Sequence, residues 1–190
     1  MVSARLLSTL AFVLFISDGA LSQDCAYEST NMDFCVWVSM GKHENDNILP
    51  ILNERPFHGT EKQEEYKKGI SDANQKLLEV LKKTETNELL VALKEALAAE
   101  GSVLSKVKDF CNGDKRSDRR CAEVVQRFAD AIDALVRGVS ELPLESSMRQ
   151  TISEAYTNYE DEYYGSENSD YAQLALTLAE TVAAALPSQN

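Results

Sequence analysis

The residues of this chain best suited to chemistry are four cysteines and two histidines. His43 and His58 each lie in a polar segment, and neither has a second ligand at the spacing that a metal site requires. A histidine in such surroundings is usually an ordinary surface residue, so we expect no catalytic or metal-binding role for either. The cysteines form two pairs with the same C-x9-C spacing, namely Cys25, Cys35, Cys111 and Cys121.

Common catalytic motifs are absent from the sequence. It has no H-E-x-x-H zinc motif, no glycine-rich phosphate loop and no G-x-S-x-G nucleophile motif. Its acid-rich segments lack the loop glycine and the terminal carboxylate of a calcium-binding loop. We therefore expect a protein that is not an enzyme and that carries no metal or cofactor.

The cysteine count predicts two disulfides, because an even number of cysteines is typical of secreted proteins with a disulfide framework. Three pairings are possible, and the sequence favours the local one, Cys25–Cys35 with Cys111–Cys121. The second pair flanks NGDKRSDRR, a polar turn expected between two helices, so those helix ends should already be close. Each local disulfide should stabilise the fold by about 2–4 kcal/mol.

The first 22 residues have the features of a secretory signal peptide. Arg5 precedes an apolar run, residues 6–16, and the small residues Ala20 and Ser22 suit the positions before a cleavage site. The run is too short to cross a bilayer, which takes about 20 apolar residues, and the alternative is a buried N-terminal helix. We expect a secreted, extracellular protein with no membrane insertion and one helical domain over residues 23–190.

The net charge of −12 constrains the partners of the protein. An acidic surface repels the phosphates of nucleic acids and the headgroups of anionic lipids. We therefore expect no nucleic-acid or membrane partner. The charge favours an extracellular protein with a basic surface, or a cation.

The spacing of apolar residues predicts an all-α protein, because they recur every three or four positions and nowhere alternate as in a half-buried strand. Helices with one apolar face must pack on one another, so we expect a single-domain bundle of about five to seven helices with two disulfides. The expected core stripes are Tyr66, Ile70, Ala73, Leu77 and Leu81; Leu89, Leu90, Leu93, Ala96 and Leu97, continued by Val103, Leu104, Val107 and Phe110; Cys121, Val124, Val125, Phe128, Ile132, Leu135, Val136 and Val139; Leu144, Met148, Ile152, Ala155, Tyr159 and Tyr163; and Tyr171, Leu174, Leu178 and Val182.

Capping residues, prolines and glycines predict where the helices begin and end. A short first helix around Trp37 should end before Pro50. Gly101 should end or bend its helix, and Gly165 should end another. The expected helix starts are Thr60 with Gln63 in a capping box, Thr86 or Asn87, Ser117 or Asp118, Pro143 in a first turn, and Ser169 or Asp170.

A basic turn lies between the cysteines of the second pair. One interpretation is a solvated turn whose cations sit near helix ends. The other is a docking surface for an acidic partner, held in place by the disulfide. Its candidate residues are Lys115, Arg116, Arg119 and Arg120.

An acidic and aromatic segment, NYEDEYYGSENSDY, covers residues 158–171. The last 41 residues carry seven acids and no basic residue, so they hold −7 of the net charge. Helix geometry cannot turn four nearby tyrosines inward together, so this segment is either a polar helix end or a face that binds a basic protein. The candidate partner-binding residues are Glu160, Asp161, Glu162 and Tyr164.

In its architecture the chain is similar to small secreted all-helical proteins from the saliva of blood-feeding insects. The leader MVSARLLSTLAFVLFISDGALSQDC, the twin C-x9-C spacings and the acidic helical body carry this likeness. The resemblance implies an immunomodulatory salivary protein that binds host molecules of haemostasis, complement or leukocyte signalling.

Three functions remain open from the sequence. The first is a secreted, non-enzymatic effector that binds an extracellular protein through its helical surface. The second is a carrier of a small hydrophobic ligand held between helices, and the third is a structural or storage protein.

Overall fold

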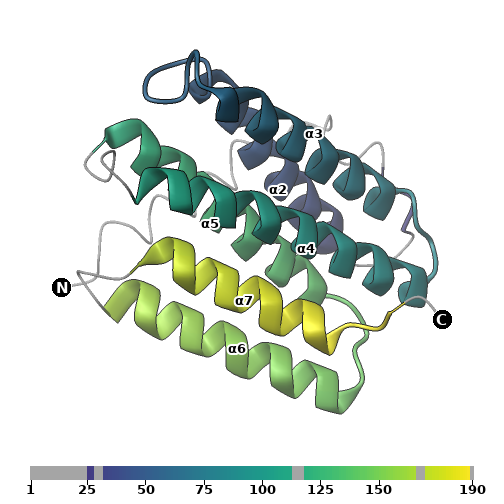
Figure 1. The fold of residues 1–190 in the computed structure, drawn as a ribbon. Helices are drawn as coiled ribbons and strands as arrows, with labels where there is room; N and C mark the ends of the chain where they lie inside the picture. Colours follow the sequence, from purple (N-terminus) through teal and green to yellow (C-terminus); the bar gives the residue numbers. More distant parts are fainter. Residues whose placement is uncertain (1–24, 28–31, 113–117, 166–169, 189–190) are drawn as a thin grey trace.

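A computed structural model describes residues 25–27, 32–112, 118–165 and 170–188, and all statements of structure below concern these ranges. They contain six helices and no strand. The helices, labelled as in Figure 1, are α2 (Met32–Ile51), α3 (Glu61–Leu81), α4 (Thr86–Cys111), α5 (Arg119–Ser140), α6 (Ser146–Gly165) and α7 (Tyr171–Ala185). The structure is therefore the all-α, single-domain bundle that the apolar pattern predicts.

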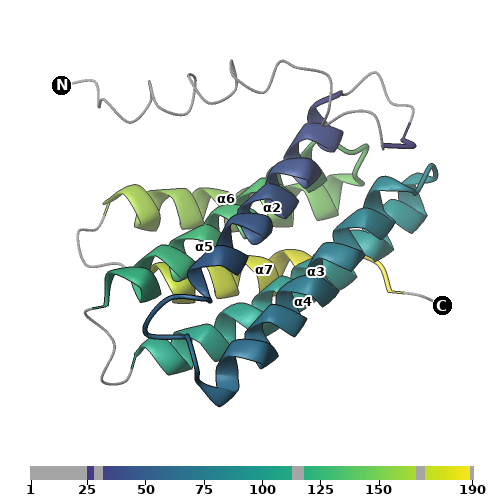
Figure 2. The ribbon, with the colours of Figure 1, turned by 90° about the horizontal axis from the view of Figure 1, so that it is seen from above.

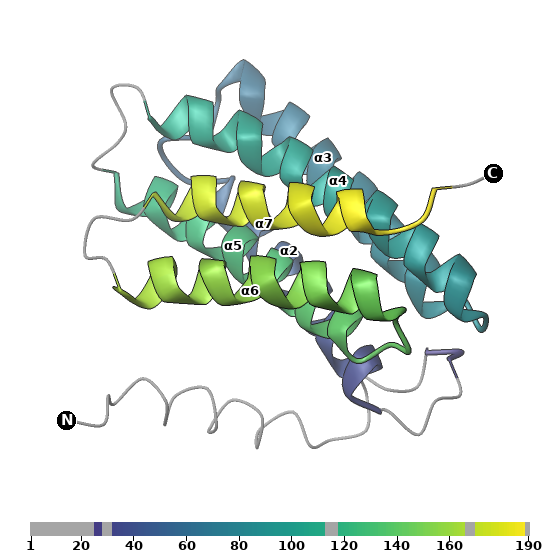
Figure 3. The same ribbon diagram turned by 90° about the horizontal axis from the view of Figure 1, so that it is seen from below.

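The helices form three stacked pairs. Viewed from above, α2 lies over α5 and α3 lies over α4 (Figure 2). Viewed from below, α7 covers α4 and α5, and α6 runs beside α7 (Figure 3). The pair α4 and α5 is thus the middle layer, and α6 with α7 forms one outer face of the bundle.

The predicted stripes supply most of the core. Phe128, Ile132 and Leu135 of the middle layer are completely buried, and so are Ile70 and Leu77 of α3. The α7 stripe is only partly correct. Its Tyr171 and Leu174 are half-buried, whereas the buried face also includes Ala172, Ala175, Leu176 and Ala179.

Helix α2 is longer than the short helix predicted around Trp37. It runs for 20 residues and ends at Ile51, one residue after Pro50, instead of forming a short element around Trp37. The prediction was wrong because the inward face of this helix is partly polar or small. Gly41 packs closely against Leu135 of α5, and Asn45 is completely buried. The regular spacing of apolar residues that predicts a helix is therefore interrupted in the second half of α2.

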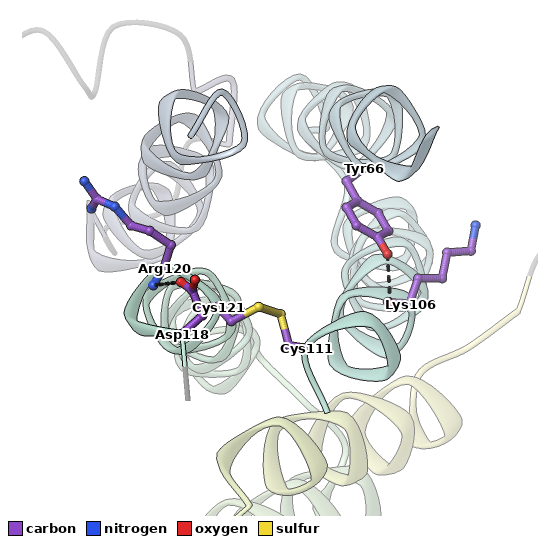
Figure 4. Close-up of a disulfide and its surroundings, with 6 residues drawn as sticks. All are labelled: Tyr66, Lys106, Cys111, Asp118, Arg120 and Cys121. Carbon is purple, nitrogen blue, oxygen red and sulfur yellow. Dashed lines mark hydrogen bonds between the residues drawn. A yellow bond between two sulfur atoms is a disulfide. The ribbon is translucent and has the colours of Figure 1, made fainter. Parts of the chain in front are cut away.

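Two of the predicted caps are confirmed. The Asp118 side chain accepts a hydrogen bond from the backbone N–H of Arg120 (2.8 Å; Figure 4). The Asp170 side chain accepts one from the backbone N–H of Gln173 (3.1 Å) and so caps α7. In both cases a carboxylate satisfies an N–H group that the first helical turn leaves unpaired.

Other boundaries differ from the prediction. The Gln63 side chain accepts a hydrogen bond from the N–H of Gly59 (3.0 Å), and Thr60 makes no side-chain cap, so the expected capping box does not form.

The N-cap of α4 is Glu85, one residue before the expected start. Pro143 precedes α6, which begins at Ser146. Gly101 does not end α4, since the helix continues to Cys111, and the alternative of a bend at Gly101 stays a prediction. Helix α6 ends at Gly165 as predicted.

Both local disulfides are confirmed. Cys111 and Cys121 join the end of α4 to the start of α5, with their Cα atoms 5.6 Å apart (Figure 4). Cys25 and Cys35, with Cα atoms 6.0 Å apart, tie the segment before α2 to its first turn. The same segment is held from the other side, because the N–H of Ala26 donates a hydrogen bond to the carbonyl of Leu81 (2.7 Å).

Candidate functional site

The basic turn is only partly described by the structure. Lys115 and Arg116 lie outside the described residues, and Arg119 is exposed at the first position of α5. Arg120 forms ion pairs with Glu54 (2.6 Å) and Glu123 (2.7 Å). These carboxylates raise the pKa of Arg120 and link the start of α5 to the segment after α2. Arg120 therefore already has partners within the molecule.

The tyrosines of the acidic segment pack into the bundle. Tyr159 is buried, and the Tyr163 hydroxyl accepts a hydrogen bond from Gln126 of α5 (2.5 Å). The Tyr156 hydroxyl donates to a carboxylate oxygen of Asp133 (2.7 Å), and burial, together with that carboxylate, raises the pKa of Tyr156 well above its usual range. These rings hold α6 on α5. The side chain of Tyr164 lies outside the described residues.

Arg137 of α5 organises the charges next to these tyrosines. Its guanidinium pairs with Asp133 (2.9 Å) and with Glu160 (3.5 Å). It also lies over the rings of Trp37 and Tyr156, 5.2 and 5.3 Å from their centroids. Glu160 therefore joins α6 to α5, whereas its neighbours Asp161 and Glu162 are exposed.

A different set of acids borders a groove between α6 and α7. Two adjoining hollows of about 450 and 740 Å³ share Thr151 and Thr181 as lining residues. Together they form what we term the α6–α7 groove, on the outer face seen in Figure 3. Four glutamates line the groove: Glu145, Glu154, Glu162 and Glu180.

The α6–α7 groove combines this charge with an apolar floor. Ala155, Leu174 and Leu178 line one hollow, and Ala184 lines the other. No basic residue is among the described residues that line either hollow. The hollow between α3 and α4 instead includes Lys83, and the hollow between α4 and α7 includes Lys94. Among these four hollows, the two that form the α6–α7 groove are lined by acidic residues without any basic residue.

Sequence reasoning identified one of the groove acids, Glu162, and missed Glu145, Glu154 and Glu180. Glu154 could have been found, because it lies beside the predicted Ile152–Ala155–Tyr159 stripe and so borders whatever helix that stripe packs on. Glu180 could not, because nothing local in the sequence shows that α7 runs along α6.

Other kinds of site were searched among the described residues. They contain no group of three histidine, cysteine, aspartate or glutamate side chains that could hold a metal ion. Within the same ranges, no helix combines the length and the apolar character needed to cross a membrane.

The chain was compared with models of protein families, with curated proteins and with solved structures, and none of the three comparisons found a match. The fold itself defines a single-domain, all-α bundle with two disulfides.

Proposed function

We propose that the protein is a secreted, non-enzymatic effector that binds a basic segment of an extracellular protein in the α6–α7 groove. The observation that carries the proposal is the lining of this groove, with four glutamates around an apolar floor and no described basic residue. The two local disulfides and the signal peptide predicted for residues 1–22 support an extracellular location.

The charge of the groove would favour a cationic partner. Clustered carboxylates attract such a partner before contact and accelerate association. Many acids elsewhere are balanced by basic residues, as in the ion pairs Lys76–Glu95 (2.7 Å) and Arg127–Glu44 (2.8 Å). No described basic residue lines the groove, so the charge of its glutamates would act on a cationic segment that enters it. Its apolar floor would then supply the contact area that holds a bound segment.

The identity of the partner follows from the resemblance to salivary proteins and not from the groove. If that resemblance holds, we expect a basic host protein of haemostasis, complement or leukocyte signalling. The basic turn at Lys115, Arg116 and Arg119 stays a second candidate surface, for an acidic partner.

A carrier function has one specific observation in its favour. The hollow between α4 and α7, of about 430 Å³, has a mainly apolar lining that includes Leu97, Leu176 and Ala179, with Lys94 among its polar residues. This volume is within the range of small-molecule sites. Native mass spectrometry of the protein from its source would show a bound small molecule if the carrier function is correct.

The protein-binding proposal is tested by association kinetics with a synthetic amphipathic peptide of leucine and lysine. The triple variant Glu154→Gln, Glu162→Gln, Glu180→Gln should lower the association rate roughly 3- to 10-fold at low salt, with little change in the dissociation rate. High salt should remove this difference, because it screens the attraction.

A matched control removes the same charge elsewhere. The variant Glu61→Gln, Glu85→Gln, Glu88→Gln changes three exposed acids at the starts of α3 and α4. It should bind the peptide almost as fast as the unmodified protein. Equal slowing by both variants, or no binding by the unmodified protein, would contradict the proposal.

A further inference from the structure

A buried polar pair lies at the centre of the four-helix unit formed by α2, α3, α4 and α5. Asn45 of α2 and Glu100 of α4 are both 0 % exposed. Their helices occupy opposite corners of this unit, as the end-on view in Figure 4 shows. The Asn45 amide nitrogen donates to Glu100 Oε1 (2.5 Å) and to Asn74 Oδ1 of α3 (3.0 Å). The pair therefore connects two helices whose backbones do not approach each other closely within the described residues.

Two atoms of this pair have no hydrogen-bond partner among the described residues. They are Asn45 Oδ1 and Glu100 Oε2. Both are acceptors if Glu100 is ionised, so neither can satisfy the other, and each would stay a buried polar atom without a hydrogen bond, which destabilises the fold. A proton on Oε2 would turn it into a donor next to the amide whose nitrogen already binds Oε1.

We propose that Glu100 is a neutral carboxylic acid that donates its proton to Asn45 Oδ1, so that the bundle takes up one proton as it folds. The acid and the amide would then form a ring of two hydrogen bonds, N–H to Oε1 and O–H to Oδ1, that leaves no polar atom of the pair unsatisfied. The inference is independent of the α6–α7 groove.

Among the residues that the structure describes, no charged neighbour acts on the Glu100 carboxyl group. Burial raises the pKa of Glu100 to about 7, opposed only by the hydrogen bond from Asn45. Gly101, the residue that follows Glu100 on α4, faces Leu176 and Ala179 of α7. Charged groups on the neighbouring turns of α2 have partners: Lys42 binds Asp46, and Glu44 binds Arg127 of α5. Arg127 keeps one buried nitrogen, Nε, without a partner among the described residues, and Asp130 of α5 accepts from Gln126. The contribution of α3 is the neutral Asn74. Burial also raises the pKa of Asp130, to about 6.

The direction of the pH effect follows from this raised pKa. Folded Glu100 holds its proton where the unfolded residue has already released it, so its contribution to stability is complete below pH of about 4.5 and is lost as the pH rises through about 7. The four-helix unit should therefore be weaker at mildly alkaline pH than at mildly acidic pH.

The test compares the unmodified protein with Glu100→Gln, whose side-chain amide can donate to Asn45 at any pH. Between pH 5 and pH 8.5, the unfolding equilibrium constant of the unmodified protein should rise relative to that of Glu100→Gln by roughly 100-fold. The control Glu95→Gln, which changes a partly exposed acid of the same helix, should keep the pH dependence of the unmodified protein. Asp130 titrates in all three proteins, so its effect cancels in the comparison.

The protonation state of Glu100 can also be measured directly in the unmodified protein, even if Glu100→Gln does not fold. In protein labelled with ¹³C at glutamate, the side-chain carboxyl signal of Glu100 should titrate near neutral pH. A carboxyl signal that titrates below pH 5, or parallel pH dependences of the unmodified protein and Glu100→Gln, would overturn the proposal.

Discussion

At the scale of single residues, position within the bundle decides what an acid can do. Glu160 and Glu162 are two residues apart on α6, yet they face different surroundings. Glu160 pairs with Arg137 of α5, whereas Glu162 lines the α6–α7 groove. The sequence places both in one acidic cluster, and only the packing of α5 and α7 on α6 separates them.

This difference gives a paired prediction. Glu160→Gln should lower the free energy of unfolding by less than about 1 kcal/mol, because its ion pair is partly exposed, and should leave peptide association nearly unchanged. Glu162→Gln should slow association, because it removes a charge from the lining of the groove. Urea unfolding and stopped-flow binding would measure the two effects. The distinction fails if Glu160→Gln slows binding as much as Glu162→Gln does.

At the scale of the helices, two glycines in helix interiors have opposite packing. A Cβ atom on Gly101 of α4 would lie 3.8 Å from Leu176, which is an ordinary contact. A Cβ atom on Gly69 of α3 would lie 2.6 Å from a methyl group of Val103, which is too close. Gly69 thus permits the close approach of α3 to α4, whereas the fold does not require glycine at position 101.

Substitution by alanine should therefore have opposite effects at these two positions. Gly101→Ala should stabilise the protein by about 0.5–1 kcal/mol, because alanine favours the helix. Gly69→Ala should destabilise it by about 1–3 kcal/mol, because Val103 must move. The measurement is the free energy of unfolding in urea. A loss of stability in Gly101→Ala would show that α4 and α7 are closer than described.

The helices also show how far the sequence predicts the fold. Strong apolar periods locate α3, α4 and α5, and Asp118 and Asp170 mark true helix starts. The length of α2 could not be predicted, because its buried positions include Gly41 and Asn45. These residues depend on partners that are distant in sequence, such as Leu135 and Glu100.

At the scale of the whole molecule, the candidate site depends on which helices are neighbours. The sequence predicts an acidic C-terminal region, and the net charge of this region predicts a basic partner. It cannot predict that α6 and α7 form an outer face with a groove between them, since that follows from the packing of α7 on α4 and α5. Glu145 and Glu180 join the site only through this arrangement.

The central claim is that the α6–α7 groove binds a basic segment, and NMR mapping tests it most directly. Backbone amide signals of the isotope-labelled protein would be followed as the leucine–lysine peptide is added. We expect the largest shifts at groove residues such as Thr151, Thr177 and Thr181, with the amides of α3 nearly unchanged. Shifts that centre on α3 or on the turn before α5, with the groove signals unmoved, would contradict the claim.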